Sequence, residues 1–226
     1  MAASEHLFEE GGEAPDISGP EPGPARGMAE LAILEAAAEC FSERGFTATS
    51  VDEVARRMGY TKGRVYHYFR SKGELFIAAA SHGLDRLVAE VWPAHQAPGS
   101  DAERLAAMAR AHVNCQMRDI PYHRVMLQGV TLVLHGATTP DERDLLAQFA
   151  ARQRNYEQVF AKVISAGQTS GSFAPGNLVI ATKTFLLTLN GSCFWFSRRD
   201  DQSAEELEAI AEQMVRQAIW GLNGGG

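Results

Sequence analysis

The sequence predicts an all-α protein in which a small N-terminal helical domain precedes a larger helical domain. Apolar residues recur at three- and four-residue spacing through most of the 226 residues, which is the period of a helical face. No segment of useful length shows the two-residue alternation of a β-strand. A composition of 45% hydrophobic and 22% charged residues is sufficient for a buried core.

The two ends of the chain differ from the rest. Residues 1–27 are rich in Gly, Pro and Glu and poor in large apolar residues, so we expect a disordered acidic tail. Residues 223–226 are expected to form a flexible Gly-rich end. No signal peptide and no apolar run near the roughly 20 residues needed to cross a bilayer is apparent. We therefore expect a cytoplasmic protein with no membrane contact.

The cysteines give no indication of a metal site or a disulfide. Cys40, Cys115 and Cys193 lie far apart and lack the CxxC spacing of a structural zinc site. Each is expected to be a buried apolar residue in a reducing compartment. The sequence predicts no metal and no cofactor.

The stretch 49–69 is predicted to form two short helices around a tight turn. Thr49 or Ser50 can cap the first helix, whose acidic first turn suits the positive end of the helix dipole. Gly59 can adopt the positive φ that ends this helix, and Thr61 is the next capping candidate. The preceding helix, which begins near Met28, is expected to end at Gly45.

The second short helix has an unusual exposed face. Val65 and Phe69, one turn apart, are expected to point inward. The remaining side chains include two cations and three aromatic rings, and the window between Glu43 and Glu74 is net basic although the whole chain carries a formal charge of -7. This pattern favours nucleic-acid binding. The alternative is an ordinary helical hairpin with a charged face.

A long helix is predicted to join the two domains. Ser71 followed by Glu74 has the capping-box pattern that begins a helix, and apolar spacing continues from there to Pro93. The predicted domains are therefore 28–74 and 75–222. Further helices are expected after Pro121 and from Pro140, and over 178–196 and 204–222.

The first domain resembles the DNA-binding domain of the tetracycline-repressor (TetR/AcrR) family. The resemblance rests on Ile33-Leu34-Glu35-Ala36-Ala37, Phe41, Gly45-Phe46, Thr49-Ser50-Val51, and the run from Gly63 through Tyr66-His67-Tyr68-Phe69 to Ser71-Lys72-Gly73-Glu74-Leu75. It implies a homodimer whose reading helices enter adjacent major grooves of a near-palindromic operator in double-stranded DNA. It also implies a C-terminal domain that binds a small-molecule effector and then releases the DNA, so that the protein is a repressor and not an enzyme.

The expected DNA contacts combine this resemblance with the physics of a reading helix. They are Thr49, Ser50, Thr61, Lys62, Gly63, Arg64, Tyr66, His67, Tyr68 and Lys72. Lys62 and Arg64 lie in the first turn, which meets base edges in such helices, and a two-pronged bond from Arg64 to guanine contributes about 1–3 kcal/mol of discrimination. The tyrosines are expected to bond phosphates. Members of the family often carry a basic arm before the first helix, whereas this tail is acidic.

The expected effector contacts are Tyr122, His123, Met126, Phe149, Arg152, Tyr156 and Asn190. Arg152 and Asn190 stand in apolar helical stretches, where buried polar groups need partners. Core and dimer packing is the alternative for each residue. Arg152-x-x-x-Tyr156 and the later Phe194-Trp195-Phe196 loosely resemble the family branch that senses acyl-coenzyme A, and another apolar or aromatic effector is the alternative.

The resemblance also implies that the last two helices form the dimer interface. The residues expected to bury against the partner include Leu186, Leu189, Leu207, Ile210 and Met214.

Two other functions are kept open by the sequence. One is an effector-independent helical DNA-binding protein, which a tightly filled C-terminal core would favour, whereas an apolar cavity with a few polar groups would favour a sensor. The other is an enzyme with an appended helix-turn-helix. Against the enzyme, the sequence has no nucleophile paired with a base, no phosphate loop and no metal-ligand spacing.

Overall fold

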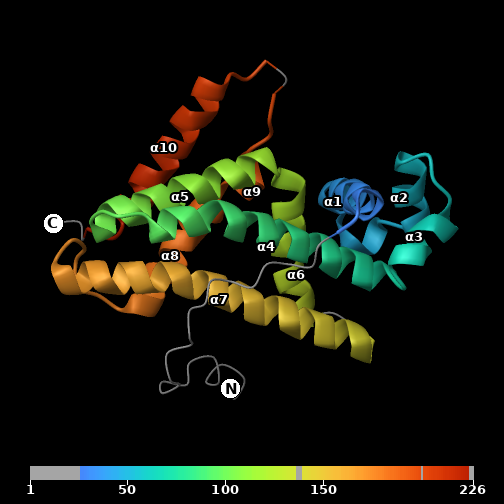
Figure 1. The fold of residues 1–226 in the computed structure, drawn as a ribbon, viewed down its shortest axis with the longest axis horizontal. Helices are drawn as coiled ribbons and strands as arrows, with labels where there is room; N and C mark the ends of the chain where they lie inside the picture. Colours follow the sequence, from blue (N-terminus) through green and yellow to red (C-terminus); the bar gives the residue numbers. More distant parts are fainter. Residues whose placement is uncertain (1–25, 136–138, 200, 224–226) are drawn as a thin grey trace.

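The predicted all-α fold is confirmed. The computed structural model describes residues 26–135, 139–199 and 201–223, and within these ranges the regular structure is helical, with no strand (Figure 1). The expected tail over 1–27 falls almost wholly outside the described residues, as does the expected flexible end over 223–226.

The N-terminal domain consists of α1 (Met28–Ala48), α2 (Val51–Arg57) and α3 (Lys62–Tyr68). The regular part of α1 ends where expected, because Gly45 has a φ of 78° and kinks the chain. Its core is formed by fully buried apolar side chains from all three helices, among them Ile33, Phe41, Val54 and Val65.

Helix α4 (Lys72–Gln96) begins at the predicted position and joins the two domains. Ser71 Oγ accepts a hydrogen bond from the backbone N–H of Glu74 at 3.0 Å, and Glu74 in turn accepts one from the backbone N–H of Arg70 at 2.6 Å. The helix packs against α1 and also against α5, α6 and α7. It therefore contacts the core of both domains along a single rigid element.

The larger domain contains α5 (Asp101–Arg118), α6 (Ile120–His135), α7 (Pro140–Ser170), α8 (Leu178–Asn190), the short α9 (Ser192–Trp195) and α10 (Ala204–Trp220). Figure 1 shows α4, α5 and α7 running along the length of the molecule, with α1 to α3 gathered at one end. Helix α10 follows an extended connection and packs against α5 and α8. Capping boxes at Ser100, Thr139 and Ser203 fix the starts of α5, α7 and α10.

One part of the predicted dimer interface is wrong. Leu186 and Leu189 are 5% and 0% exposed, because they pack into the core of their own chain. Leu207, Ile210 and Met214 are only partly buried on α10. The large apolar side chains that remain exposed on α8, α9 and α10 are Val179, Ile180, Leu187, Phe194, Trp195 and Trp220.

The stretch Leu178–Trp195 is, by length and composition alone, apolar enough to cross a membrane. Its mean hydropathy is 1.2, and a third of it is buried inside the protein. In the fold it is α8 followed by α9, with a break at Gly191, and Arg124 of α6 donates hydrogen bonds to the carbonyls of Cys193 (2.9 Å) and Phe196 (2.8 Å).

Candidate functional site

Helix α3 presents the face that the sequence predicted. Val65 and Phe69 are 0% and 3% exposed, and they anchor the helix on the core of the N-terminal domain. The exposed side chains are Thr61, Lys62, Arg64, Tyr66, His67 and Tyr68, with Gly63 exposed among them. Tyr66 and Tyr68 are 40% and 39% exposed, an unusual surface position for aromatic rings.

The two cations of α3 are held by neighbours rather than fully free. Lys62 Nζ lies 3.1 Å from Asp52 Oδ2 and 5.6 Å from the centre of the Tyr66 ring. The hydrogen bond to Asp52 raises the pKa of the Lys62 ammonium. The guanidinium of Arg64 stacks 4.1 Å above the ring of Tyr60. This stacking restricts the side chain of Arg64 without using its hydrogen-bond donors, so they stay available for a base or a phosphate.

The turn between α2 and α3 has the expected construction. Gly59 has a φ of 67°, and the N–H of Tyr60 donates to the carbonyl of Ala55 at 2.8 Å. Ser50 caps α2 by accepting from the N–H of Glu53 at 3.2 Å. Thr61 occupies the N-cap position of α3 but makes no side-chain cap bond. A side-chain carbon at Gly63 would have no neighbour within 4 Å, so the space above this glycine is open.

Thr49 and Lys72 lie differently from the expected phosphate contacts. Thr49 is 2% exposed, and its hydroxyl donates to the carbonyls of Gly45 (2.9 Å) and Cys40 (3.1 Å), so it is not accessible to a phosphate in this structure. Lys72 is half-buried, with Nζ at 2.9 Å from the carbonyl of Phe46 and 3.1 Å from that of Thr49. Both side chains therefore close the end of α1.

Two exposed cations near α3 were not among the predicted contacts. Arg56 on α2 and Arg70 after α3 are exposed, and neither side chain forms an ion pair within the described part of the chain. Arg57 differs, because it bonds Glu43 (2.7 Å) and Glu39 (2.8 Å) and so ties α2 to α1. Sequence alone could not separate these three arginines, because the partners of Arg57 lie on another helix.

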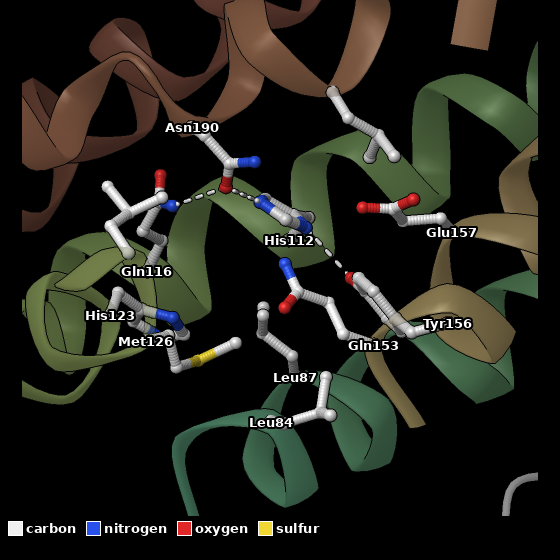
Figure 2. A pocket seen from close by; sticks show the side chains of 12 residues that line it. Leu84, Leu87, His112, Gln116, His123, Met126, Gln153, Tyr156, Glu157 and Asn190 are labelled. Atoms are coloured by element: carbon white, nitrogen blue, oxygen red, sulfur yellow. Dashed lines mark hydrogen bonds between the residues drawn. The ribbon is translucent and has the colours of Figure 1, made fainter. Parts of the chain in front are cut away.

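A small cavity of about 40 Å³ lies inside the larger domain, between α4, α5, α6, α7 and α8. Figure 2 shows the side chains of the 12 residues that line it. Four of the predicted effector contacts are among them, namely His123, Met126, Tyr156 and Asn190. The lining combines apolar side chains, among them Leu84, Leu87 and Leu186, with several polar groups.

Three predicted effector contacts do not line this cavity. Tyr122 is buried beside the ring of His82, at 5.2 Å between ring centres. Phe149 is 1% exposed and packs in the core near Gly129. Arg152 forms an ion pair with Asp85 of α4. Each side chain is occupied by a contact with a residue distant in sequence, and these predictions are corrected accordingly.

A chain of hydrogen bonds runs along one wall of the cavity (Figure 2). Gln116 Nε2 donates to Asn190 Oδ1 at 2.9 Å, and His112 Nε2 lies 3.2 Å from the same oxygen. On its other side, His112 Nδ1 lies 2.8 Å from the hydroxyl of Tyr156. Ser192 Oγ donates to Gln116 Oε1. The wall is therefore a set of buried polar groups that satisfy one another.

His112 and Gln116 are site residues that the sequence reading did not select. They stand four residues apart on the apolar face of α5, which also carries Met108 and Val113. Two polar side chains at this spacing on a buried face were the signal that could have found them.

Burial keeps both cavity histidines neutral. It lowers the pKa of His112 to about 4 and that of His123 to about 3. A hydrogen bond to Asn190 acts against this shift at His112, and a bond to the backbone of Cys115 does so at His123. Neutral rings each offer one donor and one acceptor. Among the described residues, no group of three or more His, Cys, Asp or Glu side chains is placed to hold a metal ion.

Comparison with known proteins decides the family. The family model described as "Bacterial regulatory proteins, tetR family" matches residues 33–79, which contain α2 and α3. A second model, "Tetracyclin repressor-like, C-terminal domain", matches residues 98–219, more than half of the chain. The chain belongs to the TetR family. The resemblance of the first domain is thereby confirmed and extended to the second.

Individual relatives agree with this assignment. Over 96 residues the chain is 33% identical to the HTH-type transcriptional activator FasR of Mycolicibacterium smegmatis, covering 42% of this chain and less than half (44%) of that protein. It is 27% identical to the HTH-type transcriptional repressor KstR2 of Mycobacterium tuberculosis (strain CDC 1551 / Oshkosh), covering 63% of this chain and 68% of that protein. The crystal structure of AibR in complex with isovaleryl coenzyme A and operator DNA is similar, with a TM-score of 0.67 and 26% identity over 84% of this chain and 97% of that chain.

This chain is accordingly a TetR-family regulatory protein, with α2 and α3 as its helix-turn-helix. Its relatives are named as regulators of transcription and not as enzymes. They include both an activator and a repressor, so the family alone does not fix the sign of regulation.

Proposed function

We propose that this protein is a dimeric, ligand-responsive repressor that reads operator DNA with α3 and releases it when a small molecule enters the cavity of the larger domain. The observation that carries the DNA-binding part is the face of α3, on which Arg64 stacks on Tyr60 with its donors free, beside the open space above Gly63. A guanidinium in the first turn of a reading helix can bond the O6 and N7 atoms of guanine.

The other exposed groups of this face supply phosphate contacts in the proposal. Tyr66, Tyr68 and His67 surround the reading residues, and Ser50 and Thr61 stand at the two helix starts. Arg56 and Arg70 add positive charge on the same small domain. Such contacts position a protein on the duplex without reading sequence.

Arg64→Ala tests the reading role. The affinities of the wild type and the variant are measured at one salt concentration for an operator and for its single-base variants. Loss of a bidentate contact predicts a relaxed preference at one base pair, worth about 1–3 kcal/mol. Arg154→Ala, which changes an exposed arginine on α7, is the matched control. Unchanged base preference in Arg64→Ala would refute the assignment.

The proposed dimer uses the exposed apolar face of α8, α9 and α10. Ile180 and Leu187, each 66% exposed, are seven residues apart on one face of α8, and Phe194 (73%) and Trp220 (66%) add to it. Large exposed apolar side chains of this kind are typical of an interface between subunits. Ile180→Glu combined with Leu187→Glu should shift the mass measured by light scattering from dimer to monomer. Gln158→Glu, an exposed change on α7, should leave it unchanged.

The cavity is proposed as the effector site because α4 and α6, two of the helices that line it, also contact the DNA-binding domain. Helix α4 brings Leu84 and Leu87 to the cavity and Lys72 to the end of α1. Gln128 of α6 donates to the carbonyl of Phe41 at 3.0 Å, two residues after the cavity residue Met126. A ligand that prefers a different spacing of these helices shifts the orientation of α3 and lowers operator affinity.

The size and lining of the cavity support a small effector. Coenzyme A carries phosphates that call for cationic partners, and no Lys or Arg is among the residues that line the cavity. The structure of AibR contains isovaleryl coenzyme A. The likeness to AibR therefore supports a ligand-binding role for the larger domain, but it gives little support for coenzyme A as the ligand of this protein. The effector-independent alternative is less well supported. It favours a tightly filled core in the larger domain, whereas this domain contains a cavity lined by several polar groups.

A further inference from the structure

The cavity has a defined pattern of donors and acceptors. Asn190 Oδ1 accepts from Gln116 Nε2, so the contact with His112 at this oxygen requires Nε2 of His112 to carry the proton. Because this ring is neutral, its Nδ1 is an acceptor, and the proton between His112 and Tyr156 comes from the tyrosine hydroxyl. Two of these bonds, from Gln116 and from His112, meet at Asn190 Oδ1, and none of the bonds in the wall uses the amide N–H groups of Asn190.

A second group in the cavity lacks a partner. His123 is 2% exposed, and its Nε2 has no hydrogen-bond partner within the described part of the chain. A neutral histidine carries its proton on one ring nitrogen and a free lone pair on the other, so the unpartnered Nε2 of His123 can act as an acceptor. Leaving such an acceptor unpaired in the interior is unfavourable. A ligand that donates a hydrogen bond here removes that cost.

The charges around the cavity exclude an anionic ligand. The only ionised side chain among the lining residues that the structure describes is Glu157, and it is neutralised by Lys183 at 2.5 Å. The two histidines carry no charge near neutral pH because they are buried. A carboxylate or phosphate in this space would be desolvated without a counter-charge, which is unfavourable.

The apolar side chains of the cavity determine the chemical character of the remainder of the ligand. Leu84, Leu87, Leu127 and Leu186 provide aliphatic surface in the cavity beside its polar groups. A volume of about 40 Å³ holds a polar group of a few atoms. A longer apolar body has to displace Met126, the flexible unbranched side chain beside His123 in Figure 2.

We propose that the cavity binds a neutral molecule with an aliphatic body and a hydroxyl or primary amide group, which donates a hydrogen bond to His123 Nε2 and accepts one from the side-chain amide of Asn190. The inference rests on the proposed sensor function of the same cavity. Gln153, which lines the cavity near Tyr156, adds a second amide for the same group.

The test uses probes that differ in one group. Binding of butanamide, butan-1-ol, butanone and butanoate to the full-length protein is measured by calorimetry, with methyl-labelled methionine to report contact at Met126. The amide and the alcohol should bind. Butanone, which cannot donate, should bind roughly 10-fold more weakly because His123 stays unpaired. Butanoate should bind at least as weakly as butanone. Equal binding of butanoate and butanamide would overturn the proposal.

The variant His123→Phe keeps a ring of similar size and removes the acceptor. It should bind butanamide and butanone with similar affinity, so that the roughly 10-fold preference disappears. A preference that persists in this variant would contradict the role of His123. If the variant fails to fold, the comparison of the four probes on the wild type still decides the matter.

Operator affinity is measured separately with the same probes. If butanamide binds at Met126 with the predicted selectivity but operator affinity does not change, the ligand class stands and the sensor function fails. If a probe releases the operator but His123→Phe leaves its selectivity unchanged, the sensor function stands and the ligand class fails.

Discussion

Ser71, at the N-terminal cap of α4, donates a hydrogen bond of 2.8 Å to Glu142 at the start of α7. A side-chain carbon at Gly73 would overlap Glu142, with 2.0 Å to its Oε1, so the two helix ends are in close contact. Helix α7 also carries Tyr156 and Gln153 to the cavity. Helix α7 therefore contacts the DNA-binding domain with its first turn and lines the cavity farther along its length.

Gly63→Ala separates the stability of the reading helix from its function. Because a side chain at Gly63 meets nothing within 4 Å and alanine favours helix, the variant should gain up to about 1 kcal/mol in free energy of unfolding. Its affinity for operator DNA should fall by at least about 10-fold, because the added methyl group occupies the space that the duplex would approach. Urea unfolding and a binding titration measure the two quantities.

Gly176→Ala, outside the reading helix, is the control and should leave DNA affinity unchanged. If Gly63→Ala binds the operator as tightly as the wild type, the backbone of α3 does not approach the duplex at this residue.

Lys72→Met removes a charge and keeps the aliphatic stem over the ring of Phe46. In this structure the ammonium donates hydrogen bonds to backbone carbonyls at the end of α1. The variant should therefore destabilise the end of α1 and weaken binding to every DNA sequence. The slope of log affinity against log salt concentration should stay the same. A slope reduced by about 0.9 would show instead a direct phosphate contact, as the family resemblance implies.

Gly83→Ala tests the coupling between the cavity and the reading helix. The new carbon would lie 3.0 Å from both Met126 Sδ and Tyr122 Cβ, so α4 and α6 must move apart by a few tenths of an ångström. This change imitates a ligand between the two helices, and operator affinity without effector should fall by about 5-fold. A titration with operator DNA measures it.

Gly129→Ala makes the same chemical change on α6 at an ordinary contact distance of 3.4 Å from Phe149, and it is the control. Normal operator affinity in a folded Gly83→Ala protein would indicate that the spacing of α4 and α6 does not control α3.

The buried histidines predict a loss of stability in mild acid. The pKa values of His112 and His123 are lowered to about 4 and about 3 in the folded protein, whereas an unfolded histidine titrates near 6.5. The unfolded chain therefore binds protons that the folded chain does not. Stability is complete above about pH 6.5 and falls as the pH decreases toward 4, by about 2 kcal/mol per histidine at about pH 5.

Urea unfolding at about pH 7 and about pH 5 measures this loss. His123→Phe should reduce this loss of stability by the contribution of one histidine. His67→Gln, which changes an exposed ring, should leave the loss unchanged. Equal stability at both pH values would mean that these rings are not held neutral.

The N-terminal domain could be predicted in detail because its determinants are local. Gly59 is required where φ is positive, and Val65 with Phe69 fixes the inner face of α3 within a single turn. Ser71 and Glu74 mark the start of α4 three residues apart. Each of these relationships is complete within a few residues, so the sequence pattern is sufficient to identify it.

The cavity could be predicted only in part, because its walls come from five helices. Whether Arg152 faces the cavity depends on Asp85, 67 positions earlier in the chain, and no local pattern contains that pairing. Apolar residues such as Leu186 and Leu189 suit the core of a subunit and an interface between subunits equally well. Only the rotation of α8 about its axis decides which of the two locations they occupy. His112 and Gln116 were detectable in principle, because two buried polar groups shared one helical face.

The central claim is that α3 reads DNA, and footprinting of the DNA flanking the gene of this protein tests it most directly. The wild type should protect two half-sites related by a two-fold axis, about one helical turn or a multiple of it apart. Arg64→Ala should lose this protection at the same protein concentration, while Arg154→Ala should retain it. A footprint that Arg64→Ala leaves intact, or the absence of any protected site, would contradict the account.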